Sequence, residues 1–175
     1  MRTIRLFGWL VLAALAPAAH AEVPAALGDL HGKIVWVDFW ASWCAPCRRS
    51  FPWLNEMQRK YAADGLEIIG VNVDKDRKEA DAFLAETPAQ FALRFDPNGD
   101  LAKAFDVQAM PSSYVLDAEG HVLARHFGFR LEDRAAYEEA IRSALAAAGS
   151  GTARPGGDEN QSARRSGGKN DGRSE

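Results

Sequence analysis

Two cysteines separated by two residues are the side chains of this sequence best suited to covalent chemistry. Cys44 and Cys47 follow a short apolar run and open a segment with helical spacing. Cysteines three positions apart in the first turn of a helix bring their sulfurs within reach of a disulfide. The unpaired N–H groups and partial positive charge of a helix N-terminus favour a thiolate at the first cysteine. The pattern predicts Cys44 as a nucleophile and Cys47 as the thiol that resolves a mixed disulfide.

Other uses of the cysteine pair can be weighed from the same residues. A purely structural disulfide across so short a loop removes little entropy from the unfolded chain, so it would add little stability. Zinc normally takes four ligands, and no second cysteine pair is present. The four histidines are isolated and are expected at the surface or in turns: His20, His31, His121 and His126. We expect no metal site, although thiolates select copper(I), so a copper-handling module stays an alternative.

The composition is that of one folded domain with an ordinary core. The chain has 175 residues, of which 47% are apolar and 26% charged, and this excludes a disordered protein of low hydrophobicity. Two cysteines are too few for a small fold held together by disulfides. The net charge of −3, from 21 basic and 24 acidic residues, gives no indication of nucleic-acid binding. Function must therefore come from a localised site.

Both ends of the chain differ in composition from the part between them. Residues 1–21 contain Arg2, Arg5, an apolar run over residues 6–16 and an Ala-x-Ala pattern, which is typical of a secretory signal peptide. That run of 11 residues is shorter than the roughly 20 that a membrane-spanning helix needs, so an uncleaved anchor is the weaker alternative. Residues 151–175 are rich in glycine and serine and predict a disordered tail. Residues 22–150 then form the domain.

Within that domain the hydrophobic pattern alternates between the strand and helix periods. Strands are predicted at residues 34–40, 66–73, 92–95, 112–116 and 121–127. Helices are predicted at residues 44–63, 76–86, 101–105 and 131–147, the second opened by a capping box at Asp76 and Glu79. Strand–helix units followed by a hairpin predict an α/β fold with a mixed sheet of four or five strands and helices on both faces.

The sequence resembles the thioredoxin-like thiol:disulfide oxidoreductases of the TlpA and ResA type, which include reductases of cytochrome c maturation. The likeness rests on residues 29–33, residues 37–47, Phe51-Pro52 and residues 110–117, and it covers nearly all of residues 27–147. It implies a thioredoxin-like fold. It also implies that the segment between Asp74 and Asp100 is the extra helix and strand that such proteins carry.

The resemblance assigns roles to residues outside the cysteine pair. Pro111 matches the cis-proline beside the active-site disulfide, where the preceding backbone can pair with a substrate chain like an added strand. The expected substrate contacts are Trp40, Trp43, Ala45, Pro46 and Met110. Trp40 and Trp43 are expected to form an apolar platform around Cys44, while Trp36 and Trp53 are expected in the core.

Asp38 matches the buried carboxylate of thioredoxins, which accepts the proton of the resolving thiol. Desolvation at such a position should raise its pKa. TlpA and ResA proteins commonly have an uncharged residue here, and many carry an acid where this sequence has Ser50. Our hypothesis is that Asp38 replaces that acid as the proton acceptor; the alternative is that Asp38 only completes a hydrogen-bond network.

The implied activity is disulfide exchange with protein substrates in the periplasm, with no cofactor beyond the Cys44–Cys47 redox pair. The resemblance favours a reductase, recharged by a membrane thiol reductant of the DsbD or CcdA kind. We expect the protein to be a monomer. Apocytochrome c is a candidate client. A general disulfide oxidant or isomerase is the alternative within redox chemistry, because the direction of exchange depends on a reduction potential that residue types do not specify.

Overall fold

The strand predicted to be central lies at the middle of the sheet. β1 (Ile34–Trp40) is buried along its whole length, as expected for a nearly continuous run of β-branched and aromatic residues covered on both faces. It pairs in parallel with β2 (Leu66–Asn72) and antiparallel with β4 (Ser112–Leu116). The computed structural model describes Leu27 and residues 32–151. The predicted signal peptide and nearly all of the predicted tail lie outside these residues.

Five strands form one mixed sheet in the order β3-β2-β1-β4-β5. The edge strands are β3 (Ala92–Phe95), parallel to β2, and β5 (Val122–Phe127), antiparallel to β4. This architecture confirms the thioredoxin-like α/β fold with a mixed sheet. The segment between Asp74 and Asp100 contains a helix and β3, as the resemblance implies.

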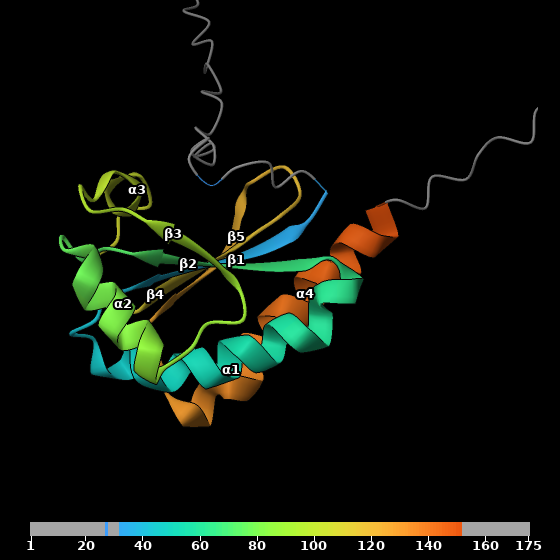
Figure 1. The fold of residues 1–175 in the computed structure, drawn as a ribbon. Helices are drawn as coiled ribbons and strands as arrows, with labels where there is room; N and C mark the ends of the chain where they lie inside the picture. Colours follow the sequence, from blue (N-terminus) through green and yellow to red (C-terminus); the bar gives the residue numbers. More distant parts are fainter. Residues whose placement is uncertain (1–26, 28–31, 152–175) are drawn as a thin grey trace, which may run out of the picture.

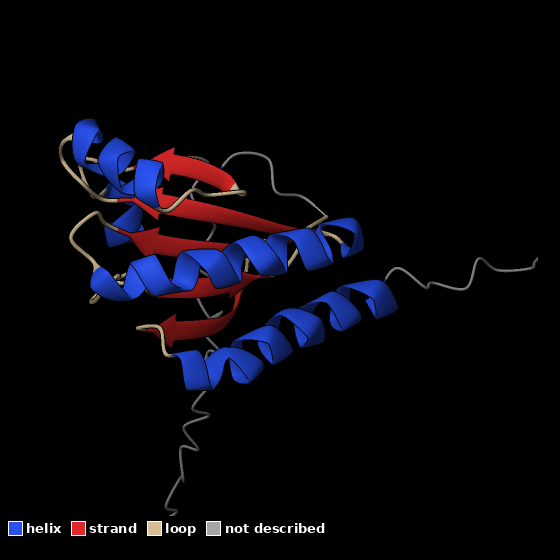
Figure 2. Ribbon diagram, turned by 60° about the horizontal axis from the view of Figure 1, so that its bottom comes forward, coloured by secondary structure: helices blue, strands red, loops and turns tan. Residues whose placement is uncertain are grey.

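Helices cover both faces of the sheet, which is also as predicted (Figures 1 and 2). α1 (Ala45–Tyr61), α2 (Arg77–Glu86) and α4 (Arg134–Gly151) contribute to the core on one face. α3 (Asp100–Ala104) lies over the other face. None of the helices among the described residues has the length and apolar composition needed to cross a membrane.

The ends of the helices follow local chemistry. Asp76 caps α2 by accepting a hydrogen bond from the Lys78 N–H, at 2.9 Å. The helix predicted to end at residue 63 finishes as α1 at Tyr61 and continues as a 3-10 turn, Ala62–Asp64. The last helix begins with a 3-10 turn at Leu131–Asp133, and α4 runs to Gly151, past the predicted domain end at residue 150.

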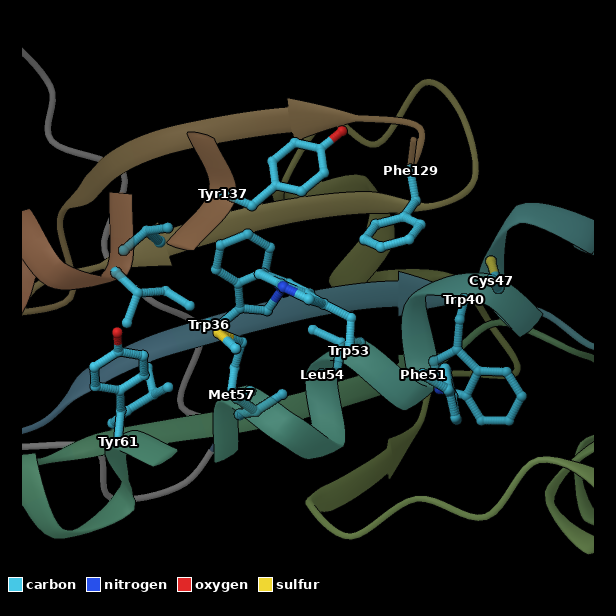
Figure 3. Packing of buried hydrophobic residues seen from close by; sticks show 14 of the residues in the cluster. Trp36, Trp40, Cys47, Phe51, Trp53, Leu54, Met57, Tyr61, Phe129 and Tyr137 are labelled. Carbon is cyan, nitrogen blue, oxygen red and sulfur yellow. The ribbon is translucent and has the colours of Figure 1, made fainter. Parts of the chain in front are cut away.

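Alternation along β1 divides the core into two layers. Ile34, Trp36 and Trp40 face α1, where Trp36 packs edge-on against Trp53 with ring centres 5.4 Å apart (Figure 3). The intervening side chains face α3 and form the second layer with Leu101, Phe105 and Tyr114: Val35, Val37 and Phe39. Asp38 shares the face of Trp36 and Trp40, so a carboxyl group lies inside the first layer.

Candidate active site

Cys44 and Cys47 are joined by a disulfide at the N-terminus of α1. The S–S distance is 2.02 Å and the Cα atoms are 5.3 Å apart. Cys44 is the N-cap residue, and its sulfur accepts a hydrogen bond from the Cys47 N–H at 3.2 Å. Pro46 lies in the first turn, where its missing N–H leaves no intrahelical bond unmade. Cys47 is fully buried and Cys44 is 3% exposed, so solvent reaches the first cysteine more readily.

The Met110–Pro111 peptide bond is cis, in agreement with the implied proline. Ser112 pairs with Phe39 in the sheet, which places Pro111 next to the end of β1, from which the chain leads to Cys44. The Pro111 carbonyl accepts a bond from Gly128 N–H at 2.8 Å. None of the hydrogen bonds among the described residues involves the main chain of Met110. The main chain before the cis-proline is therefore left with pairing capacity near the end of β1.

Asp38 is buried beneath the layer formed by α1. Its Oδ1 accepts a hydrogen bond of 2.6 Å from the Ser113 hydroxyl, and Oδ2 has no hydrogen-bond partner among the described residues. Burial raises the pKa of Asp38 to about 7, and the Ser113 hydroxyl and the Trp36 indole offset part of that rise. Ser113 is the direct donor, whereas the Trp36 N–H makes no hydrogen bond within the described part of the chain and acts only as a nearby dipole. The predicted upward pKa shift is confirmed, and near neutral pH this group can both take up and return a proton.

Ser50, where the resemblance leads us to expect an acid in many TlpA and ResA proteins, places a buried hydroxyl group in α1. Ser50 donates to the Cys47 carbonyl at 3.1 Å, a local bond within α1. It provides no carboxylate near the disulfide. Asp38 lies on the sheet face that α1 covers, two residues before Trp40, whose ring contacts Phe51 one turn after Cys47.

The expected substrate contacts divide between the surface and the core. Trp43 is 69% exposed, Ala45 is exposed, and Pro46 and Met110 are half-buried. The prediction for Trp40 is wrong, because its side chain is fully buried (Figure 3). Trp40 ends β1 on the face covered by α1 and α2, and its ring packs against Phe51 at 5.1 Å and Phe83 at 4.8 Å. Trp36 and Trp53 lie in the core, as expected.

The expectation for the histidines is wrong at one position. His126 is half-buried, with its ring stacked on Trp36 at 5.4 Å, and burial lowers its pKa. His20 and His31 lie outside the described residues. In the described part of the chain, one partly exposed group of three residues has ligand atoms within 4.8 Å of one another: Asp117, Glu119 and His121. It forms the β4–β5 turn, where Asp117 accepts bonds from the N–H groups of Glu119 and His121.

Sequence reasoning missed Asp74, which holds the loop before the cysteines. Its carboxylate accepts hydrogen bonds from the Ser42 N–H at 2.9 Å, the Ser42 hydroxyl at 3.1 Å and the Asn72 side chain at 2.7 Å. The sequence did contain a signal for this contact. Asp74 follows β2 closely, and the carboxyl ends of the parallel strands β1 and β2 meet at one edge of the sheet, so Asp74 could have been expected near the loop that follows β1.

Comparison with known proteins agrees with this geometry. A family model described as Redoxin matches residues 13–141. The thiol-disulfide oxidoreductase ResA of Bacillus thuringiensis subsp. konkukian is 33% identical over 97 residues, which cover 55% of this chain and 56% of that protein. ResA of Bacillus subtilis is 31% identical over 97 residues, covering 55% of this chain and 54% of that protein. The chain thus spans little more than half the length of these curated relatives.

A solved structure from Chlorobium tepidum, described as a candidate thiol:disulfide interchange protein DsbE, superimposes with a TM-score of 0.67. It is 48% identical to this chain, and the superposition covers 68% of this chain and 84% of that one. The family match includes all five strands, the cysteine pair and the cis-proline. The chain therefore belongs to the redoxin family and carries, as Cys44–Cys47, the redox pair of a thiol-disulfide oxidoreductase similar to ResA and DsbE.

Proposed function

We propose that this protein reduces disulfides in protein substrates in the periplasm. The observation that carries the proposal is a disulfide at a helix N-terminus. The cis Met110–Pro111 bond, which precedes the strand paired with β1, and the exposed ring of Trp43 support it. A helix N-terminus stabilises a thiolate, and the thiolate is the nucleophile of disulfide exchange.

The reaction uses two successive exchanges. In the reduced protein, the Cys44 thiolate attacks a substrate disulfide, so a bond forms between Cys44 and one substrate sulfur and the other substrate sulfur leaves as a thiolate. The Cys47 thiol gives its proton to Asp38, and its sulfur then attacks Cys44. This step forms the Cys44–Cys47 disulfide and releases the second substrate thiolate. Overall the substrate disulfide gains two electrons and the protein dithiol loses two.

Asp38 suits this proton transfer because burial raises its pKa to about 7. A carboxyl group with an ordinary pKa of 3.8 would be a weak base toward a thiol, whose pKa is about 8.5. Raising the pKa of the acceptor reduces this mismatch, and general bases are most effective when their pKa lies near the working pH.

Substrate contact is assigned to the surface around Cys44. Trp43 and Ala45 flank it in the sequence and are exposed, while Pro46 and Met110 lie half-buried. The unpaired main chain of Met110 can add an extended substrate segment as a short strand beside the disulfide. This mode of binding contacts the main chain and the apolar side chains of the substrate. Because these groups are accessible in unfolded or loosely folded proteins, such proteins are the substrates it fits.

The proposed location rests on the signal-like segment in residues 1–21. In the periplasm, a membrane thiol reductant of the DsbD or CcdA kind would return the Cys44–Cys47 pair to the dithiol. Apocytochrome c, which must have reduced cysteines before haem attachment, is the client we propose to test first.

Trapping of mixed disulfides tests the function. Cys47→Ser removes the resolving thiol, so substrates should remain attached to Cys44 in the native host and can be identified after purification. A Cys44→Ser and Cys47→Ser double variant controls for contaminants. If the single variant captures no protein while the wild type exchanges disulfides in solution, the proposal of specific clients is wrong.

The reduction potential, measured by equilibration with glutathione, tests the direction of exchange. A value of about −270 mV, as in thioredoxin, supports a reductase, whereas a value of about −120 mV, as in DsbA, indicates an oxidant.

A further inference from the structure

Asp74 brings a buried negative charge to the loop that carries Cys44. Its Oδ1 accepts from the Ser42 hydroxyl, and its Oδ2 accepts from the Ser42 N–H and the Asn72 side chain. An amide N–H, a side-chain NH₂ and a hydroxyl group can all donate to this carboxyl group, which is the set of partners that suits a carboxylate. All three donors are neutral, and no lysine or arginine among the described residues forms an ion pair with Asp74. Asp74 is 5% exposed, so water screens this charge poorly.

Cys44 lies close to this charge because the loop turns tightly. The Cys44 N–H donates to the Ala41 carbonyl at 3.1 Å, so residues 41–44 form one turn whose ends lie less than about 7 Å apart. Since Ser42 is bonded to Asp74, the distance from the carboxylate to the Cys44 sulfur is on the order of 10 Å. The N-terminus of α1 favours a thiolate at Cys44, whereas a negative charge at this distance opposes it.

We propose that Asp74 is a positioning residue that tunes the Cys44–Cys47 pair toward the reduction of substrates. Its charge disfavours the Cys44 thiolate and with it the dithiol form of the protein, because stabilisation of the reduced form is what makes such a pair oxidising. A less stable dithiol gives up its two electrons and two protons more readily to a substrate disulfide. This inference deepens the proposed reductase function and rests on it for its biological meaning.

The test compares the reduction potentials of whole-protein variants at equilibrium with glutathione. Asp74→Asn removes the charge. The equilibrium is measured at a pH at which Cys44 is thiolate in both proteins. For one charge at roughly 10 Å and an effective dielectric constant of about 20, it should then shift about tenfold toward the dithiol, which is a potential about 30 mV less negative. The rate of alkylation of Cys44 at slightly acidic pH should rise by about the same factor, because a larger fraction is thiolate.

Two control variants separate charge from structure. Ser42→Ala removes one hydrogen bond and keeps the charge. Asp96→Asn removes a second buried carboxylate, which accepts from the Ala102 N–H at 2.9 Å and follows β3, one strand further from Cys44. Each control should shift the dithiol–disulfide equilibrium less than about threefold. Ser42→Ala leaves the carboxyl group of Asp74 in place, and the carboxyl group of Asp96 acts from a greater distance, over which charge effects weaken. Three other ionisable residues are unchanged in all three variants. Arg48 and Arg49 follow Cys47 in the sequence, and Asp38 lies on the sheet face that α1 covers.

The outcomes decide the proposal in either direction. An unchanged potential in folded Asp74→Asn overturns it, and so does an equal shift in either control. If Asp74→Asn does not fold, Asp74→Ser is measured in its place, and if neither neutral variant folds, Asp74 is a structural residue and the proposal is rejected. No client is needed for this measurement. A wild-type potential in the oxidising range would refute the proposal that the protein is a reductase. The difference in potential between the wild type and Asp74→Asn would still show whether the charge of Asp74 tunes the cysteine pair.

Discussion

Replacing Asp38 by asparagine tests the central electrostatic feature of the site. In the folded, disulfide-bonded protein, burial raises the pKa of Asp38 from 3.8 to about 7. Between these two values the folded state keeps a proton on this group that the unfolded chain has released. The stabilisation is therefore full below the unfolded pKa and is lost as pH rises through the folded pKa. The free energy of unfolding should fall by about 4 kcal/mol between pH 4 and pH 8 through this one group.

The asparagine variant should lose this pH dependence. Asp38→Asn keeps the shape and an oxygen that can accept from Ser113, but it cannot become charged. We expect about wild-type stability at pH 4 and, at pH 8, a stability higher than that of the wild type by up to about 4 kcal/mol. Urea unfolding of both oxidised proteins from pH 4 to pH 8, with unchanged m-values, measures the difference.

Other titrating groups do not obscure this result. Burial lowers the pKa of His126 below its ordinary 6.5, so below that pH His126 makes stability rise with pH, the opposite sign to Asp38. Carboxyl groups with lowered pKa values, such as Glu138 beside Lys60, act in the same direction as His126. These contributions are present in both proteins and cancel in the difference. If wild type and variant show the same pH dependence, the burial argument is refuted.

The remaining predictions concern the reaction and the packing. Asp38→Asn should slow release of a mixed disulfide at pH 8 by about 100-fold, because Cys47 loses its proton acceptor; an unchanged rate in stopped-flow fluorescence removes Asp38 from the mechanism. Trp40→Ala should cost about 3–5 kcal/mol in urea unfolding, whereas Trp43→Ala should change stability by less than about 0.5 kcal/mol and weaken client capture; equal losses would contradict their placement. Gly70→Ala puts a methyl carbon 2.9 Å from Phe91 and 3.1 Å from Nε1 of Trp40, so we expect a loss of about 1–3 kcal/mol. Wild-type stability in that variant would mean that these rings move aside freely.

Local patterns in the sequence were sufficient for the reactive pair and for most elements. The strand over residues 34–40 and the helix that follows are set by side-chain alternation and helical spacing, which act over a few residues. The position of Cys44 at a helix N-cap follows from the same spacing. The cis form of the bond before Pro111 was implied by resemblance to a family, since residue spacing alone does not choose between cis and trans.

The tertiary structure decided how far each side chain is exposed and which distant groups meet. Trp40 and Trp43 are near neighbours in sequence, yet only the packing of α1 and α2 onto the sheet buries the first and leaves the second in solvent. Ser42 and Asp74 are 32 positions apart and meet because parallel pairing brings the ends of β1 and β2 together. The raised pKa of Asp38 likewise depends on desolvation by the assembled core. Burial and long-range hydrogen bonds are properties of the packed chain, and a pattern of neighbouring residue types does not contain them.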